Sequence, residues 1–284
     1  MFSIRSILAI SGSDVESINK AIHSDADAIL VDLNDNVLSD HLNNKLSFAL
    51  KAVFDSGRPL LLRISIDNLT YLTDNLSSIC SGYFAGLVVE GVEIPQDVRD
   101  ADVALRKYEG AQNLQPGVIV LFPEISSVEG LTALSSIVEA VDRIGAMFVN
   151  RNQIASDFGR KPNFSGLNNY ILSRTAIETR AKRIPWVLAE YDKNIQSKLI
   201  STSYNSDAFG IVVTSEAQVS GINSLFTPNI FEVDHAKKIV NKSENLQNQQ
   251  DSKLNANFGL GKIALRRAYW LLEQVKLISM REKK

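Results

Sequence analysis

Short apolar runs recur through the first three quarters of the chain, and stretches with helical periodicity separate them. Val, Ile and Leu fill these runs without polar alternation, which is typical of strands buried on both faces of a parallel sheet. The runs are Ile4–Ile10, Ala28–Asp32, Leu60–Ile64, Gly86–Glu90, Val118–Glu124, Ala146–Asn150, Trp186–Glu190 and Phe209–Thr214. Eight strand and helix units in succession predict an α/β fold, a (β/α)8 TIM barrel.

The segments between the runs predict amphipathic helices that cover this barrel. Their apolar residues repeat at intervals of three and four, which places them along one helix face. Two such stripes are Leu42, Leu46, Ala49, Leu50 and Val53, and Leu131, Leu134, Ile137, Val138 and Val141. In a TIM barrel the carboxyl ends of the strands carry the chemistry. The residues that end the apolar runs are therefore the candidates for a site.

The pattern changes after Val240, where Asn, Gln, Ser and charged residues dominate. A segment of that composition buries too little apolar surface to order itself. We expect a barrel domain over residues 1–240, a flexible polar linker over 241–257, and a C-terminal helical extension over 258–284. A helix on such a tether packs on its own barrel or on a neighbouring subunit, and the second arrangement gives a homo-oligomer.

Composition narrows the functional classes. The chain has 284 residues, 45% of them hydrophobic, with a net charge of −2. It lacks the basic excess of a nucleic-acid groove, so we expect no DNA or RNA partner. It also lacks an apolar stretch of about 18 residues, so we expect no membrane span. Its one cysteine, Cys80, excludes an internal disulfide and favours a reducing, cytoplasmic location.

Several blocks of the sequence resemble a known family in order and spacing. They are RSILAI, DADAILVDLNDNV, LLRIS, GLVVEGVEIPQDV, VLFPEI and SEAQVSGINSLFTPNIFEVDHAKKIV. Together they resemble the citrate lyase beta-subunit and malyl-CoA lyase branch of the HpcH/HpaI aldolase superfamily. The resemblance implies a Mg2+-dependent carbon–carbon lyase of the aldolase type that acts on a hydroxy acid, an oxo acid or an acyl-CoA thioester. It also implies a trimer or a hexamer.

The resemblance suggests roles for individual residues. Asp35 matches the second acid of the family's LEDAV motif and is the expected acid/base, whereas Asn34 replaces the first acid. Arg63 matches the arginine that holds the substrate carboxylate, a task suited to a planar fork of donors. An ion pair at the barrel rim is the alternative for Arg63. Glu124 matches the first metal ligand, and a glutamate that ends a buried run needs a cation nearby.

Other positions depart from the family pattern. Gln153 stands where the second metal-binding carboxylate is expected, and it offers an oxygen without a charge. Because Mg2+ prefers anionic oxygens, we expect its binding to be weak or lost. Glu90 and Gly91 replace a Pro-Lys pair. Glu90 is then a rearranged ligand that binds substrate or metal, a general base, or, as we favour, an ion-pair partner of Arg63.

Two functions are therefore weighed. The first is a citrate lyase beta-subunit-like lyase in which Mg2+ stabilises an enolate and in which activity is altered or impaired. The second is a pseudoenzyme, a non-catalytic TIM barrel that serves as a binding or structural subunit of a larger biosynthetic assembly. A barrel fold alone does not decide between them, because barrels host unrelated functions.

Overall fold

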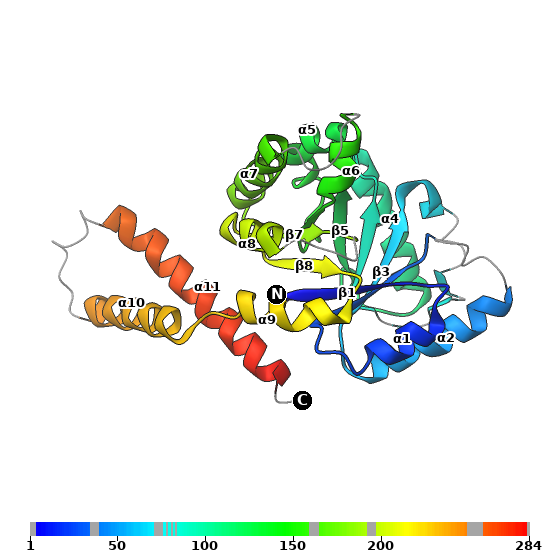
Figure 1. The fold of residues 1–284 in the computed structure, drawn as a ribbon, viewed down its shortest axis with the longest axis horizontal. Coiled ribbons are helices and arrows are strands. Elements are labelled where there is room, and N and C mark those ends of the chain that lie inside the picture. Colours follow the sequence, from blue (N-terminus) through cyan, green and yellow to red (C-terminus); the bar gives the residue numbers. More distant parts are fainter. Residues whose placement is uncertain are drawn as a thin grey trace. The chain divides into compact units, whose positions relative to one another are not determined.

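Eight parallel strands form a closed barrel in the computed structural model, and each strand pairs with the next along the chain (Figure 1). The barrel closes where β8 pairs with β1, from Ser6 opposite Ile211 to Leu8 opposite Val213. The strands are β1 (Ser6–Ser11), β2 (Ala28–Asp32), β3 (Leu60–Ser65), β4 (Gly86–Glu90), β5 (Val120–Ile125), β6 (Met147–Val149), β7 (Trp186–Ala189) and β8 (Gly210–Val213). The predicted (β/α)8 barrel is confirmed.

The structure describes residues 4–34, 40–70, 76–77, 79–80, 82, 84–158, 165–191, 197–248 and 258–282. Asp35, the expected acid/base, lies outside these residues.

Helices follow the strands and cover the outside of the barrel (Figure 1). They are α1 (Val15–Ala21), α2 (Asp40–Asp55), α4 (Pro95–Ala111), α5 (Val128–Ile137), α6 (Arg151–Ser156), α7 (Ser165–Ala181), α8 (Ser197–Asn205) and α9 (Val219–Phe226), with 3-10 turns at Ile66–Asn68 and Glu216–Gln218. The predicted stripes are buried wherever the structure describes their side chains, except Val141, which is half-buried. The buried members are Leu46, Ala49, Leu50, Val53, Leu131, Leu134, Ile137 and Val138.

The core lies within the strands and beneath these helices. All residues of β7 and β8 are buried, as their unbroken apolar runs predict. Each large apolar side chain removed from water contributes roughly 1.5–3 kcal/mol. Barrel closure also depends on one small residue, because a Cβ atom on Gly210 would lie 2.1 Å from the carbonyl oxygen of Ile4. The segment that leads into β1 approaches β8 too closely at that point for a side chain.

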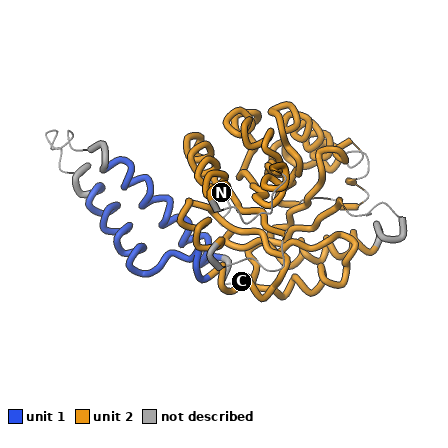
Figure 2. Tube along the Cα trace, turned by 45° about the horizontal axis from the view of Figure 1, so that its top comes forward, with its two compact units in different colours: residues 1–3, 224–284 blue, residues 4–223 orange. Residues whose placement is uncertain are grey.

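The chain divides into two compact units, Ile4–Asn223 and a second unit made of Met1–Ser3 with Ser224–Lys284 (Figure 2). In the second unit, α10 (Ile230–Asn248) packs against α11 (Phe258–Glu282). Ala236, Val240 and Ala268 form the buried centre of this helix pair. Within the described residues, no helix is both long and apolar enough to cross a membrane.

Helix α10 continues beyond the predicted end of the barrel domain. Residues 241–248, expected to begin a flexible linker, belong to this helix, and residues 249–257 lie outside the described residues. Polar composition limits the burial of a segment, but an existing helix gains one backbone hydrogen bond for each added residue. The backbone of residues 241–248 therefore extends a helix that the apolar pair Ala236 and Val240 already anchors.

Candidate functional site

Three carboxylates surround the guanidinium of Arg63 at the carboxyl ends of the strands, which we call the mouth of the barrel. Arg63 Nε lies 2.9 Å from Glu124 Oε2, and one terminal nitrogen of Arg63 lies 2.9 Å from Glu124 Oε1. The other terminal nitrogen lies 2.5 Å from Asp32 Oδ2, and the nitrogen that faces Glu124 Oε1 also lies 2.8 Å from Glu90 Oε1. We call Asp32, Arg63, Glu90 and Glu124 the mouth cluster. Its two-pronged contact with Glu124 is the strongest geometry for such a pair.

Strand register brings these four residues together. Asp32 on β2 lies opposite Arg63 on β3, and Glu90 on β4 lies opposite Glu124 on β5. Ser65 at the end of β3 lies opposite Glu90. The cluster therefore spans four adjacent strands. A shift of one residue in any of these pairings would turn a charged side chain to the other face of the barrel wall.

Tyr191 and Asn150 complete the surroundings of Glu124, whose side chain is fully buried. The Tyr191 hydroxyl donates a hydrogen bond of 2.7 Å to Glu124 Oε2. The Tyr191 ring lies over the Arg63 guanidinium, 4.3 Å from its carbon to the ring centroid, which is a favourable cation–π distance. The Asn150 amide lies 3.4 Å from Glu124 Oε1. Both oxygens of Glu124 are thus engaged by side chains of the protein itself.

Two amides hold Glu90 in a similar way. Asn34 donates a hydrogen bond of 2.8 Å to one oxygen of Glu90, and Gln153 donates one of 3.1 Å to the other. The Asn34 side-chain oxygen, Oδ1, accepts a hydrogen bond of 2.5 Å from the backbone N–H of Ser65. Gly91 follows with φ of +81°, a conformation in which residues with a Cβ are strained. Glycine at this position therefore meets a backbone requirement.

The ionisation of the mouth cluster follows from burial and from its surplus of negative charge. Burial raises the pKa of Asp32 and of Glu90 above their ordinary values, although the charge of Arg63 acts in the opposite direction. Burial also opposes the charge of Arg63, but the neighbouring carboxylates outweigh it and raise the Arg63 pKa. Burial and the charge of Glu124 raise the pKa of Tyr191, so its hydroxyl stays a donor. One permanent cation therefore faces three acids.

This arrangement does not fit Mg2+. The ion prefers octahedral oxygen ligands and is usually held by one or two carboxylates together with water and substrate. Here the oxygens of Glu124 face Arg63 and Tyr191, and the Gln153 amide faces Glu90 instead of sharing a site with Glu124. Among the described residues, no group of three His, Cys, Asp or Glu side chains is placed to hold a metal ion. The Arg63 guanidinium occupies the position among these acids that a metal ion would need.

The structure brings together most of the residues singled out in the sequence. Arg63, Glu90, Glu124 and Gln153 all lie at the mouth, with Gln153 bonded to Glu90 and not to Glu124. The favoured ion pair between Glu90 and Arg63 is present. Sequence reasoning passed over Asp32, although it ends the apolar run Ala28–Asp32 and was therefore detectable. Asn150 carried the same signal, because it ends the apolar run Ala146–Asn150. Tyr191 lies one residue beyond the run Trp186–Glu190, and its role depends on contacts across the barrel.

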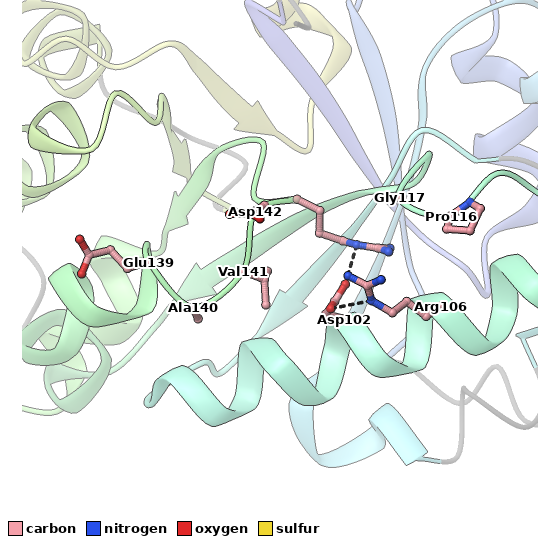
Figure 3. Close-up of a pocket in the computed structure, with 9 residues that line it drawn as sticks. Asp102, Arg106, Pro116, Gly117, Glu139, Ala140, Val141 and Asp142 are labelled. Carbon is pink, nitrogen blue, oxygen red and sulfur yellow. Dashed lines mark hydrogen bonds and ion pairs between the residues drawn. The ribbon is translucent and has the colours of Figure 1, made fainter.

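Two cavities accompany the charged residues. One of about 410 Å3 opens at the mouth and is lined by Ala9, Ile10, Ser11, Asp32, Arg63, Glu90, Asn150, Asn152, Gln153, Tyr191 and Thr214. The other, about 480 Å3, lies beside α4 and the loops that enter β5 and β6 (Figure 3). In it, Asp102 pairs with Arg106 on the same helix and with Arg143. Arg143 also pairs with buried Glu109, so these charges hold the amino-terminal end of the barrel together.

Comparison with known proteins agrees with this architecture. The family model described as HpcH/HpaI aldolase/citrate lyase matches residues 5–218, and the chain belongs to that family. Citrate lyase subunit beta of Escherichia coli (strain K12) is 21% identical over 249 residues, which cover 84% of this chain and 82% of that protein. Lyases of the citrate lyase beta and HpcH aldolase type are therefore its relatives at the level of the superfamily.

Solved structures share the fold. Protein CitE from Mycobacterium tuberculosis, in complex with magnesium, acetoacetate and coenzyme A, superposes with a TM-score of 0.63 at 13% identity, covering 96% of this chain and 98% of that one. A Haloferax volcanii malate synthase in a pyruvate/acetyl-CoA ternary complex has a TM-score of 0.66 at 12% identity, covering 87% of this chain and 81% of that one. At such identities the likeness concerns the fold alone.

Proposed function

We propose that this chain is a small-molecule-binding barrel of the citrate lyase beta type in which Mg2+-assisted carbon–carbon cleavage is impaired. The observation that carries the proposal is the mouth cluster. Arg63, with its side chain 6% exposed, directs nitrogens to Asp32, Glu90 and Glu124. A substrate carboxylate has to compete with these three resident carboxylates for the same donors. A metal ion has to compete with Arg63 for the same oxygens.

Electrostatic magnitudes support this reasoning. Two unit charges about 4 Å apart interact by roughly 4 kcal/mol at an effective dielectric constant of 20. Displacing Arg63 from its carboxylates sacrifices interactions of that order, and a ligand has to offset the loss before it binds. Gln153 contributes no charge toward holding a metal. In this arrangement the site offers neither a place for the metal ion nor a free arginine for the substrate carboxylate, and the family's lyase reaction needs both.

A calorimetric titration with Mg2+, in the absence and presence of oxaloacetate or pyruvate, tests the proposal. We expect no Mg2+-dependent heat and no Mg2+-dependent cleavage of a hydroxy-acyl-CoA such as malyl-CoA. Mg2+-dependent cleavage that Glu124→Gln abolishes would overturn the proposal. Glu139→Gln is the matched control, because Glu139 is exposed and pairs with Lys182 away from the mouth.

A second candidate is an active lyase that cleaves a hydroxy acid or its CoA thioester with Mg2+. Family membership favours it, as does the location of Arg63 and Glu124 together at the mouth, since these residues match the family's substrate-binding and metal-binding residues. It requires Arg63 to turn away from Glu124 when substrate and metal enter. The same titration decides between the two candidates, since only the active lyase gives heat with Mg2+ and oxo acid together.

A further inference from the structure

Three side chains direct hydrogen-bond donors at the carboxylate of Glu90. A terminal nitrogen of Arg63 lies 2.8 Å from Glu90 Oε1, and the Gln153 amide nitrogen donates to the same oxygen at 3.1 Å. The Asn34 amide nitrogen donates to Oε2 at 2.8 Å. These three side chains, which we call the donor set, come from elements other than β4: Asn34 follows β2, Arg63 lies on β3 and Gln153 lies on α6. The donor set therefore receives a carboxylate that a different strand supplies.

Two members of the donor set are held by contacts that do not involve the carboxylate they receive. Asn34 Oδ1 accepts a hydrogen bond from the backbone N–H of Ser65, which fixes the orientation of the amide. Arg63 is held by its ion pairs with Asp32 and Glu124. A site that is ordered in advance loses little conformational freedom when a ligand binds. We therefore expect these donors to keep their positions when the received carboxylate is absent.

The place that the Glu90 carboxylate occupies adjoins open space. Glu90 lines the mouth cavity of about 410 Å3, and Ile10, Ser11 and Thr214 belong to the same lining. The Glu90 side chain is 18% exposed, so solvent reaches it. A free acid whose carboxylate took the place of Glu90 would have room in this cavity for the rest of the molecule.

We propose that Glu90 is a tethered ligand: it fills a site that Arg63, Asn34 and Gln153 build for the carboxylate of a small organic acid. A tethered group competes at a high effective concentration because its tether is short. A free acid therefore displaces Glu90 only when further contacts in the cavity add to the binding of its carboxylate. This inference rests on the proposed function and deepens it, since it names the contact that keeps a ligand carboxylate out of the mouth.

Glu90→Ala tests the inference, because it removes a methylene and a carboxylate, the equivalent of an acetate ion. The melting temperature of the full chain is measured in sodium acetate and in sodium chloride at the same ionic strength and neutral pH. We expect the melting temperature of Glu90→Ala to rise with acetate concentration, by about 2–4 °C at about five times the fitted Kd. The wild type and Glu90→Gln, in which a side chain still fills the place, should give the same melting temperature in both salts.

A neutral probe and a second variant serve as controls. Acetamide has the shape of acetate, but its NH2 group would face the donors, so we expect no effect on Glu90→Ala. Glu139→Ala is the matched control variant, because it also removes a carboxylate from an ion pair. The Glu139 side chain is 56% exposed and pairs with Lys182 away from the mouth, so acetate should leave this variant unchanged.

Asn34→Asp in the Glu90→Ala background tests the donor set itself. Aspartate still accepts from the Ser65 backbone but presents an acceptor where the amide donor stood, and we expect acetate to bind at least about tenfold more weakly.

Equal melting temperatures of Glu90→Ala in both salts would overturn the inference, and so would an equal acetate response in the wild type, Glu90→Gln or Glu139→Ala. If Glu90→Ala is unfolded in chloride, we expect acetate to restore the folded protein, and no recovery is the contrary result. These experiments contain no Mg2+, so their failure concerns Glu90, whereas Mg2+-dependent cleavage refutes the proposed function.

Discussion

Removing the cation from the mouth cluster is the sharpest test of the electrostatic reasoning. In Arg63→Met, the unbranched side chain still fills much of the space under Tyr191, but three carboxylates lose their common partner. Breaking a buried ion pair from one side costs about 3–5 kcal/mol, because the remaining charge is left uncompensated. The three pairs share one guanidinium, so their contributions do not add. We expect the free energy of unfolding to fall by about 3–5 kcal/mol at neutral pH.

The loss should depend on pH in a defined direction. In the wild type, burial raises the pKa of Asp32 and Glu90, and Arg63 restrains that rise. Without Arg63 both pKa values rise further. When a carboxyl group has a higher pKa in the folded state than in the unfolded state, the folded state binds its proton more tightly. The free energy of unfolding therefore falls as the pH rises. The variant is therefore expected to lie closer to the wild type at about pH 5 than at about pH 7.5.

Urea unfolding monitored by tryptophan fluorescence measures both effects. The chain has two tryptophans, so Trp270→Phe provides a background in which the buried Trp186 of β7 reports on the barrel alone. Arg106→Met is the matched control, since Arg106 pairs with Asp102 through a side chain that is 61% exposed and should change stability little. A loss for Arg63→Met no larger than that of the control would refute the reasoning, and so would a loss independent of pH.

Four further predictions address the mouth and the assembly. Gln153→Asp sets a second carboxylate against Glu90, and we expect Mn2+ or Mg2+ to raise the melting temperature of this variant but not of the wild type; equal responses would count against the account of the metal site. Tyr191→Phe removes the donor to Glu124 and should lower the free energy of unfolding by about 1.5 kcal/mol, measured by urea titration, with no loss if the hydroxyl is idle. Asp32→Asn should gain stability relative to the wild type as pH rises from about 3 to 7, because the raised pKa of Asp32 makes its ionised form unfavourable; a pH-independent difference would contradict this. Light scattering should give the mass of a trimer or a hexamer, and a monomer would end the expectation of a homo-oligomer.

The barrel was predictable because each strand carries its own signal. A run such as Trp186–Glu190 is apolar up to its last residue, and β7 occupies nearly the same residues. Strand boundaries shifted by only a few residues, as at β6, where three residues keep ladder pairing. These features depend on local composition and burial, both of which are visible in the sequence.

The mouth was predictable only in part, because its contacts depend on register between strands far apart in the chain. The family resemblance indicated Arg63 and Glu124, but the sequence does not show that one guanidinium serves three acids. Asp32 was available at the end of its run, yet the motif match directed attention to Asp35. Tyr191 follows β7 and reaches Glu124 on β5 from two strands away. Side chains that act across the barrel carry no periodic signal.

The mouth cluster also holds some strands of the barrel together more firmly than others. Arg63 on β3 forms ion pairs with side chains of β2, β4 and β5. Separating these strands would therefore break ion pairs as well as the backbone hydrogen bonds between strands. The strands β6, β7 and β8 are three or four residues long, and within the described residues they form no ion pair with that guanidinium, whose contact on this side is the ring of Tyr191, just after β7. Local opening needs least free energy where pairing is shortest. Exchange of small molecules with the interior should therefore proceed along the β6–β8 side, with the opposite side acting as a fixed wall.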